Sequence, residues 1–187
     1  HDPLRRQRQM CIRDSDDTQM GPLCTLGQMA RVESEVARAQ AQGGTVLCGG
    51  KRPEGLDGNY YEPTIINCPR QDMDIVDTEM FGPVLSVLRF KTEAEVIELA
   101  NDTVHGLAAG VFTQDSARSL RVARAIEAGI VWVNTYRVVS PIAEFGGNKG
   151  SGYGRESGFQ AMYDYTRPKT IWMNTSSEPM SNPFVMR

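Results

Sequence analysis

The 187-residue sequence has few of the residues that bind metals: it contains two histidines and four cysteines, and no Cys-x-x-Cys pair. Metal sites made of His and Cys need several of these residues at short spacings, so we expect no metal site. Cysteines scattered in this way favour a reducing cytoplasm over a disulfide-stabilised secreted fold. Cys24, Cys48 and Cys68 each lack a base nearby in the sequence, so we expect packed or exposed thiols rather than nucleophiles.

Long apolar runs are also absent. No stretch approaches the roughly 18 apolar residues of a membrane-spanning helix. From residue 16 onward there is no basic cluster of the kind that binds nucleic acid, and the formal net charge of the whole sequence is −3. Without residues 1–15, which hold four Arg and two Asp, this charge becomes −5. We therefore expect neither a membrane nor a nucleic acid as a partner.

The first residues are unusual. Residues 5–15 read Arg-Arg-Gln-Arg-Gln-Met-Cys-Ile-Arg-Asp-Ser, which matches the in-frame translation of a transposase-based sequencing adapter. The alternative is a genuine basic arm or a targeting peptide. Because so long a match to a laboratory oligonucleotide favours the adapter, we expect residues 1–15 to lie outside the fold. The rest of the chain would then be a fragment of a longer gene product.

Apolar periodicity predicts an α/β fold. Between Thr25 and Gln42 the pattern is that of an amphipathic helix, with an inward stripe of Leu26, Met29, Val32, Val36 and Ala39. Thr25-x-x-Gln28 and Thr92-x-x-Glu95 are typical of capping boxes at helix starts. Helices are expected at 25–42, 92–101 and 115–128, and strands at 45–48, 60–67, 84–90, 107–113 and 130–134. This order predicts a largely parallel sheet with helices on both faces.

A turn that leads into the predicted strand 84–90 carries two candidate binding residues. Gly82-Pro83 is a turn signal, and Glu79 and Phe81 stand just before it. Two positions apart in an extended backbone, their side chains project to the same side. A carboxylate can accept two ribose hydroxyls, and an aromatic ring can lie against a flat heterocycle. The alternative, on spacing alone, is an exposed Glu and a core Phe at a strand entrance.

A glycine-rich stretch lies near the end of the chain, with six glycines in the thirteen residues 146–158. Such a loop could cradle a phosphate. However, Gly152-x-Gly154-x-x-x-Gly158 misses the dinucleotide-binding spacing by one residue, and no strand directly precedes it. We expect instead a chain that crosses closely over other backbone, where only glycine fits.

Four stretches of the sequence resemble the NAD(P)-dependent aldehyde dehydrogenase family. Glu-Met-Phe-Gly-Pro-Val at 79–84 is similar to that family's Glu-x-Phe-Gly-Pro-Val signature. The other three stretches, which occur in the family's order, are 20–23, 106–111 and 145–156. The resemblance runs from about residue 16 to about residue 169.

This resemblance implies oxidation of a small aldehyde to a carboxylic acid through a Cys thioester, with NAD or NADP as cofactor. The nucleophile and the general base would lie upstream of residue 16, so the chain alone is expected to be inactive. Glu79 would hold the nicotinamide ribose, and Phe81 would pack against the nicotinamide side of the cofactor. Leu107 and Phe145 would line the pocket around the ring and the aldehyde, and the loop 135–144 would form the wall of the substrate entrance.

Some residues depart from the family pattern. Glu144 stands before Phe-Gly-Gly where many family members have Pro, His105 stands where many have an aromatic residue, and Gly150 follows Lys149. Glu144 and Arg137 carry opposite charges within one loop, so the polarity of the substrate stays open. The choice between NAD and NADP would be decided mainly upstream.

The resemblance also implies how the chain is organised. Residues 16–160 would be the C-terminal part of the catalytic domain, and 161–187 an oligomerisation strand and tail. The apolar strand 170–174 has no partner in the sequence, so we expect it to pair with another subunit in a homodimer or homotetramer. The alternative is a non-catalytic subunit-association module that keeps the fold, and the reading frame upstream of residue 15 would distinguish the two.

Overall fold

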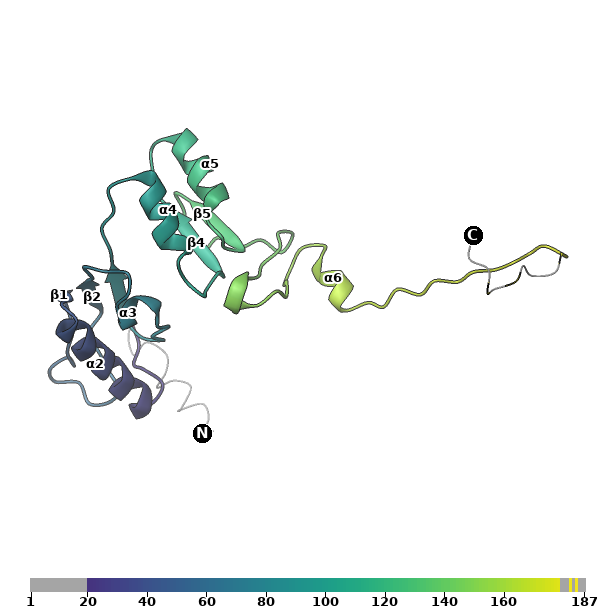
Figure 1. Ribbon diagram of the computed structural model, residues 1–187. Coiled ribbons are helices and arrows are strands. Elements are labelled where there is room, and N and C mark those ends of the chain that lie inside the picture. The colour runs from purple at the N-terminus through teal and green to yellow at the C-terminus, as the bar shows by residue number, and fades with distance from the viewer. Residues whose placement is uncertain (1–19, 179–181, 183, 185–187) are drawn as a thin grey trace, which may run out of the picture.

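The computed structural model describes residues 20–178, 182 and 184. Figure 1 shows two α/β units followed by an extended C-terminal segment. The first unit contains α2 (Leu26–Ala41), β1 (Thr45–Cys48), β2 (Thr64–Asn67), α3 (Asp74–Asp77) and β3 (Val84–Val87). The second contains α4 (Glu93–Asn101), β4 (Ala108–Val111), α5 (Ser116–Ala125) and β5 (Ile130–Val133), and is followed by the 3₁₀ turn η1 (Lys149–Ser151) and α6 (Ala161–Asp164).

The sheet topology confirms an α/β fold with parallel strand pairs. In the first unit β2 pairs in parallel with β3 across the short helix α3, and in the second unit β4 pairs in parallel with β5 across α5. The strands nevertheless form two sheets in the described chain, ordered β1-β2-β3 and β4-β5, rather than one. β1 is an antiparallel edge strand with a register shift between Val46 and Cys48.

Helix α2 supplies much of the core of the first unit. Its predicted stripe is confirmed at Met29, Val32, Val36 and Ala39, which are buried together with Ile66 of β2 and Met73. The prediction is wrong for Leu26, which lies in the first helical turn and is exposed. The second unit is more open, and Val122 of α5 is its buried apolar side chain among the described residues.

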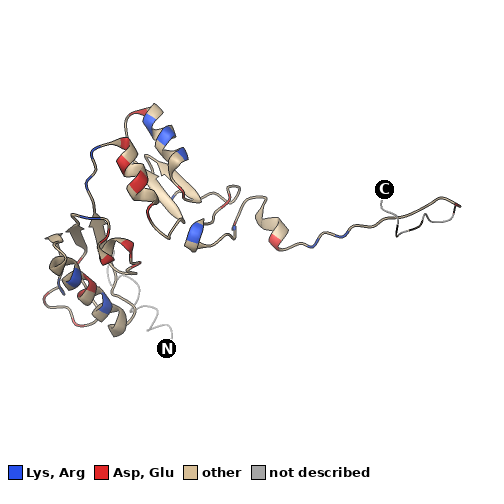
Figure 2. Ribbon diagram, in the orientation of Figure 1, with Lys and Arg blue, Asp and Glu red and all other residues tan. Residues whose placement is uncertain are grey.

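Ion pairs join α4 to α5 in the second unit. Figure 2 shows acidic residues along α4 and basic residues along α5. Glu93 accepts two hydrogen bonds from Arg121, at 2.8 and 2.9 Å, and lies 3.4 Å from Arg118. These hydrogen bonds with Arg121 lower the pKa of the Glu93 carboxyl, and the charges of the two arginines act in the same direction. The pair of helices is therefore held by charge as well as by packing.

Two strand predictions differ most from the structure, while the strands expected at 84–90 and 107–113 are shorter than predicted. The strand expected at 60–67 begins only at Thr64, directly after Pro63, because proline has no N–H to give to a ladder. The strand expected at 170–174 does not form, and the segment extends away from the body of the chain with Trp172 93% exposed (Figure 1). A strand needs a neighbour for its backbone hydrogen bonds, and the single chain offers this segment none. Its pairing with another subunit stays a prediction.

Candidate functional site

The loop between α3 and β3 presents two of the three candidate cofactor residues, Glu79 and Phe81, and Leu107 lies elsewhere. Met80, between Glu79 and Phe81, is 7% exposed and belongs to the core, whereas Glu79 and Phe81 are exposed. Phe81 is 74% exposed, so the alternative of a core phenylalanine is wrong. Phe112 and Phe159 are exposed to a similar extent, at 70% and 71%, so the fixed backbone around Phe81 distinguishes this residue more than its exposure does.

Helix α2 fastens this loop through its side chains. The Gln28 amide donates hydrogen bonds to the carbonyl oxygens of Met80, at 2.5 Å, and Phe81, at 3.0 Å. The Arg31 guanidinium donates to the carbonyl oxygen of Glu79 at 3.2 Å. Three successive carbonyls of the loop are thus held from one helix, and Glu79 makes this contact through its backbone, which leaves its carboxylate for other partners.

Close packing against α2 fixes the next residue of the loop. A Cβ added to Gly82 would lie 2.6 Å from Cγ2 of the buried Val32, closer than real Cβ atoms approach. Phe81 itself has a φ of 46°, in the left-handed region that a bulky side chain rarely adopts. Strained backbone of this kind persists where surrounding contacts fix it, and it concentrates at binding sites.

Phe145 lines a pocket of about 500 Å³ in the second half of the chain. It exchanges two backbone hydrogen bonds of 2.7 Å with Glu156. The pocket is bounded by β5, by the predicted entrance loop (residues 135–144) and by the segment around Glu156. Its lining residues are Ile130, Val138, Val139, Ser140, Pro141, Ala143, Glu144, Phe145, Glu156 and Ser157. Apolar walls with a few polar groups are typical of small-molecule sites.

Aromatic side chains brace the start of the entrance loop. The Trp132 indole N–H donates to the carbonyl oxygen of Val138 at 2.7 Å. The ring of Tyr136 meets Trp132 edge to face, with centroids 5.4 Å apart. The guanidinium of Arg137 lies 5.4 Å from the centroid of the Tyr136 ring. Arg137 therefore interacts with an aromatic face, while Glu144 lines the pocket.

Leu107 lies immediately before β4 and is 44% exposed. Its carbonyl oxygen accepts a hydrogen bond from the backbone N–H of Ile130 at 3.2 Å. Glu79 and Phe81 stand together on one loop of the first unit, whereas Leu107 and Phe145 belong to the second unit and its extension. The four predicted residues thus come from two parts of the chain.

The glycine-rich stretch makes close backbone crossings, as predicted from the sequence. A Cβ on Gly129 would clash with the carbonyl group of Gly146, and a Cβ on Gly146 would clash with the carbonyl oxygen of Gly154. The Arg155 guanidinium donates to the carbonyl oxygen of Gly147 at 2.7 Å. Arginine and glycine together hold the segment that follows Phe145 in a compact form.

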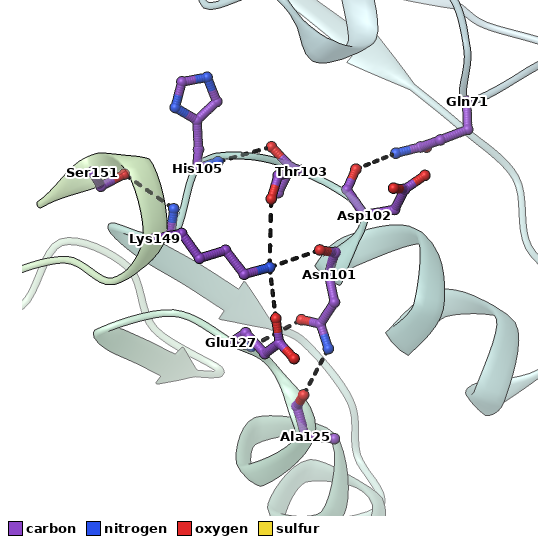
Figure 3. Close-up of polar contacts among 10 residues, drawn as sticks. Gln71, Asn101, Asp102, Thr103, His105, Ala125, Glu127, Lys149 and Ser151 are labelled. Atoms are coloured by element: carbon purple, nitrogen blue, oxygen red, sulfur yellow. Dashed lines mark hydrogen bonds and ion pairs between the residues drawn. The ribbon is translucent and has the colours of Figure 1, made fainter.

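A lysine joins this segment to the ends of two helices (Figure 3). Lys149 Nζ donates to the carbonyl oxygen of Asn101 at 2.7 Å and to that of Thr103 at 3.4 Å, and pairs with the Glu127 carboxylate at 2.7 Å. The Asn101 side chain in turn donates to the carbonyl oxygen of Ala125 and accepts from the backbone N–H of Glu127, both at 2.8 Å. The segment from Phe145 to Lys149 is therefore held in place by the C-terminal ends of α4 and α5.

The three cysteines of the described residues differ in their exposure. Burial raises the pKa of the Cys68 thiol, and hydrogen bonds from Ser86 and Val87 only partly offset this effect. A buried, protonated thiol is a poor nucleophile. Cys24 and Cys48 are exposed free thiols. Within the described residues, no group of three or more His, Cys, Asp or Glu side chains could hold a metal ion, and no helix is long and apolar enough to span a membrane.

Gln28, Arg31 and Lys149 were not predicted from the sequence as site-forming residues. Gln28 had a signal, but the signal predicted a capping box. Thr25 Oγ1 does accept a hydrogen bond from the Gln28 N–H at 3.1 Å, whereas the Gln28 side chain is bound to the loop instead. Arg31 and Lys149 carried no local signal because the groups that they bind lie about fifty residues away in the sequence.

Comparison with known proteins extends the resemblance. Residues 4–171 match the model of the Aldehyde dehydrogenase family. A (Z)-2-((N-methylformamido)methylene)-5-hydroxybutyrolactone dehydrogenase of Acinetobacter baylyi is 50% identical over 95% of this chain and 36% of the relative. A betaine aldehyde dehydrogenase of Brucella anthropi is 46% identical over 91% of this chain and 36% of the relative. The chain thus spans about a third of the length of these relatives.

Solved structures agree with the sequence matches. The NAD⁺ complex of an aldehyde dehydrogenase from Bacillus cereus superposes with a TM-score of 0.82 and 42% identity, over 87% of this chain and 33% of that chain. PnpE from Pseudomonas sp. WBC-3 in complex with nicotinamide adenine dinucleotide gives a TM-score of 0.83 and 42% identity, over 88% of this chain and 34% of that chain. The family match begins at residue 4, inside the predicted adapter segment, which lies outside the described residues, so the origin of that segment stays a prediction. The chain belongs to the aldehyde dehydrogenase family.

Proposed function

We propose that this chain is the C-terminal part of an NAD(P)-dependent aldehyde dehydrogenase that oxidises a small aldehyde to a carboxylic acid. In the intact enzyme, this part of the chain would position the cofactor and the aldehyde. The Cys nucleophile that would form the thioester and the base that would activate water for its hydrolysis belong to the remaining part of the intact enzyme. The bound nicotinamide would accept hydride from the substrate.

The observation that carries the proposal is the pair of exposed side chains on the loop between α3 and β3. Glu79 offers a carboxylate that can accept hydrogen bonds from the two hydroxyls of a ribose. Phe81 offers an exposed ring on a backbone held in the left-handed region. A carboxylate and an aromatic ring fixed two residues apart fit the ribose and the flat ring of a nicotinamide nucleotide.

The aldehyde would enter along the pocket lined by Phe145. The pocket's apolar wall can exclude water from the reacting carbonyl, and the entrance loop can select among substrates. The relatives named above point to different substrates, a hydroxybutyrolactone derivative and betaine aldehyde. We therefore propose the class, a small aldehyde, and not a particular compound.

The test uses the intact enzyme and the chain by itself. We expect the intact enzyme to form NADH or NADPH with small aldehydes. We expect the 187-residue chain to form neither, because the nucleophile and the base lie outside it. An intact enzyme that oxidises no aldehyde with either cofactor would refute the proposed function. Turnover by the chain alone, above that of a variant without cysteines, would refute the division of roles.

A second candidate function is a subunit-association module without catalysis. It is favoured by the exposed apolar segment Ile171–Met173, which in a single chain covers nothing. A homodimer or homotetramer is also part of the first proposal, so association alone does not separate the two. The DNA upstream of codon 15 does: a frame that encodes a Gly-Gln-x-Cys run and a dinucleotide-binding half supports the enzyme, and a start codon close to residue 16 supports the module.

A further inference from the structure

We infer that Gln28 and Arg31 are positioning residues for the cofactor, an inference that rests on the proposed function. Neither needs to touch the nucleotide. From α2 they hold the carbonyl oxygens of residues 79, 80 and 81, and so keep the Glu79 carboxylate and the Phe81 ring presented outward. Without them the loop would keep its anchor at Met80 but lose the fixed direction of the two binding groups.

The geometry of α2 accounts for this clamp. Residues 28, 31 and 32 are three and four positions apart, so they lie on one face of the helix. Gln28 reaches the carbonyls of residues 80 and 81, Arg31 reaches that of residue 79, and Val32 packs where Gly82 leaves room. One helical turn therefore matches four successive residues of the loop. This match depends on the fixed spacing of side chains along the helix and not on any single flexible contact.

Helix α4, which also begins with a capping sequence, shows the capping interaction that the Gln28 side chain does not make. In α4, the Glu95 side chain turns back to its own N-terminus and accepts from the backbone N–H groups of Thr92, at 3.4 Å, and Lys91, at 2.6 Å. The equivalent residue of α2, Gln28, does not complete the box. Its amide N–H groups, which a glutamate would lack, are directed to the loop carbonyls instead. A residue needed only to start the helix would have the α4 arrangement.

The backbone of Phe81 explains why a clamp is needed. A bulky residue with a φ of 46° is strained relative to an extended or helical backbone. The Gln28 bond to the Phe81 carbonyl and the contact of Gly82 with Val32 lie on either side of the peptide that follows this residue. With the bond removed, Phe81 is free to relax to an extended conformation and to turn its ring away. The expected consequence is weaker cofactor binding in a correctly folded enzyme.

The experiment compares Gln28→Met with Gln40→Met in the intact enzyme. Methionine keeps the length of the side chain but donates no hydrogen bond. Gln40 is an exposed glutamine of the same helix, so it controls for the substitution itself. The dissociation constants of NAD and NADP, the KM for the aldehyde, kcat and the melting temperature are measured for each variant. We expect Gln28→Met to weaken cofactor binding about tenfold with little change in the KM for the aldehyde, and Gln40→Met to behave as the parent.

Two further variants keep the inference testable if Gln28→Met folds poorly. Arg31→Met removes a more exposed bond and should weaken cofactor binding about threefold, and Gln28→Lys restores a donor and should recover most of the lost affinity. A fall in melting temperature with unchanged cofactor affinity, or a failure of Gln28→Lys to recover it, would show a purely structural role and overturn the inference. If the parent enzyme is active and no variant differs from it, the inference fails while the proposed function stands. A parent enzyme that binds no cofactor overturns both.

Discussion

Replacing Gly82 with alanine tests the packing that fixes the loop between α3 and β3 against α2. The added Cβ would lie 2.6 Å from Cγ2 of Val32, so either the loop or α2 must move. Overpacking of this kind costs about 1–3 kcal/mol of the free energy of unfolding. The φ of Gly82 is not in the left-handed region, so alanine itself fits the backbone and regains about 0.5 kcal/mol through the unfolded state.

A second substitution shows whether Val32 is the cause of the strain. Val32→Ala removes Cγ2, the methyl group that the new Cβ would meet, together with Cγ1. It costs about 2 kcal/mol when made alone, because Val32 is fully buried. If the clash with Val32 causes most of the destabilisation by Gly82→Ala, the double variant should be little less stable than Val32→Ala. The two effects should then fall short of additivity by about 1–2 kcal/mol.

Urea denaturation followed by far-ultraviolet circular dichroism gives the four free energies of this cycle in the 187-residue chain. In the intact enzyme, Gly82→Ala should also weaken cofactor binding, and Val32→Ala should partly restore it. Strict additivity of the two stability changes would refute the reasoning, because it would mean that the alanine at position 82 is accommodated without touching α2.

Two other predictions concern thiols and association. Iodoacetamide at mildly alkaline pH should label Cys24 and Cys48 at least about tenfold faster than Cys68 in the folded chain, because burial raises the pKa of the Cys68 thiol and blocks access to it; equal rates by mass spectrometry would show that this part of the core is open. Trp172→Asp should shift the intact enzyme towards monomer in size-exclusion chromatography with light scattering, because the exposed Trp172 needs a partner surface; an unchanged mass and stability would show that this segment does not join subunits.

The helices were predictable because their signals are local. Apolar spacing and N-terminal Thr or Asp placed α2, α4 and α5 within a few residues of their observed bounds, and the box at Thr92 forms as expected. The strands were predictable in order but not in extent. A strand ends where its neighbour ends, and β2, β3, β4 and β5 each have only four paired residues. The division into two sheets also depends on pairings between strands that periodicity does not encode.

The candidate site was only partly predictable, because some of its contacts join residues that are far apart in the sequence. Glu79 and Phe81 were identified by a short motif, and both are exposed beside the buried Met80. The extended backbone assumed for them is wrong at Phe81, whose φ of 46° lies in the left-handed region. Gln28 was predicted as a capping residue because a capping box is the nearest use of a glutamine at that position. Its actual partners lie 52 and 53 residues away, and a nonlocal hydrogen bond replaced the local one.

The role of Glu79 is the central claim, and Glu79→Gln in the intact enzyme tests it most directly. Glutamine keeps the shape of the side chain but loses the charge that strengthens hydrogen bonds to ribose hydroxyls, each worth about 1.5–3 kcal/mol. Glu54→Gln, on an exposed turn of the same unit, is the matched control. We predict that Glu79→Gln lowers NAD(P) affinity and the rate of hydride transfer by about tenfold or more in single-turnover measurements, with an unchanged melting temperature. Parent-like affinity and rate in a folded variant would contradict the account and return Glu79 to the role of an ordinary exposed residue.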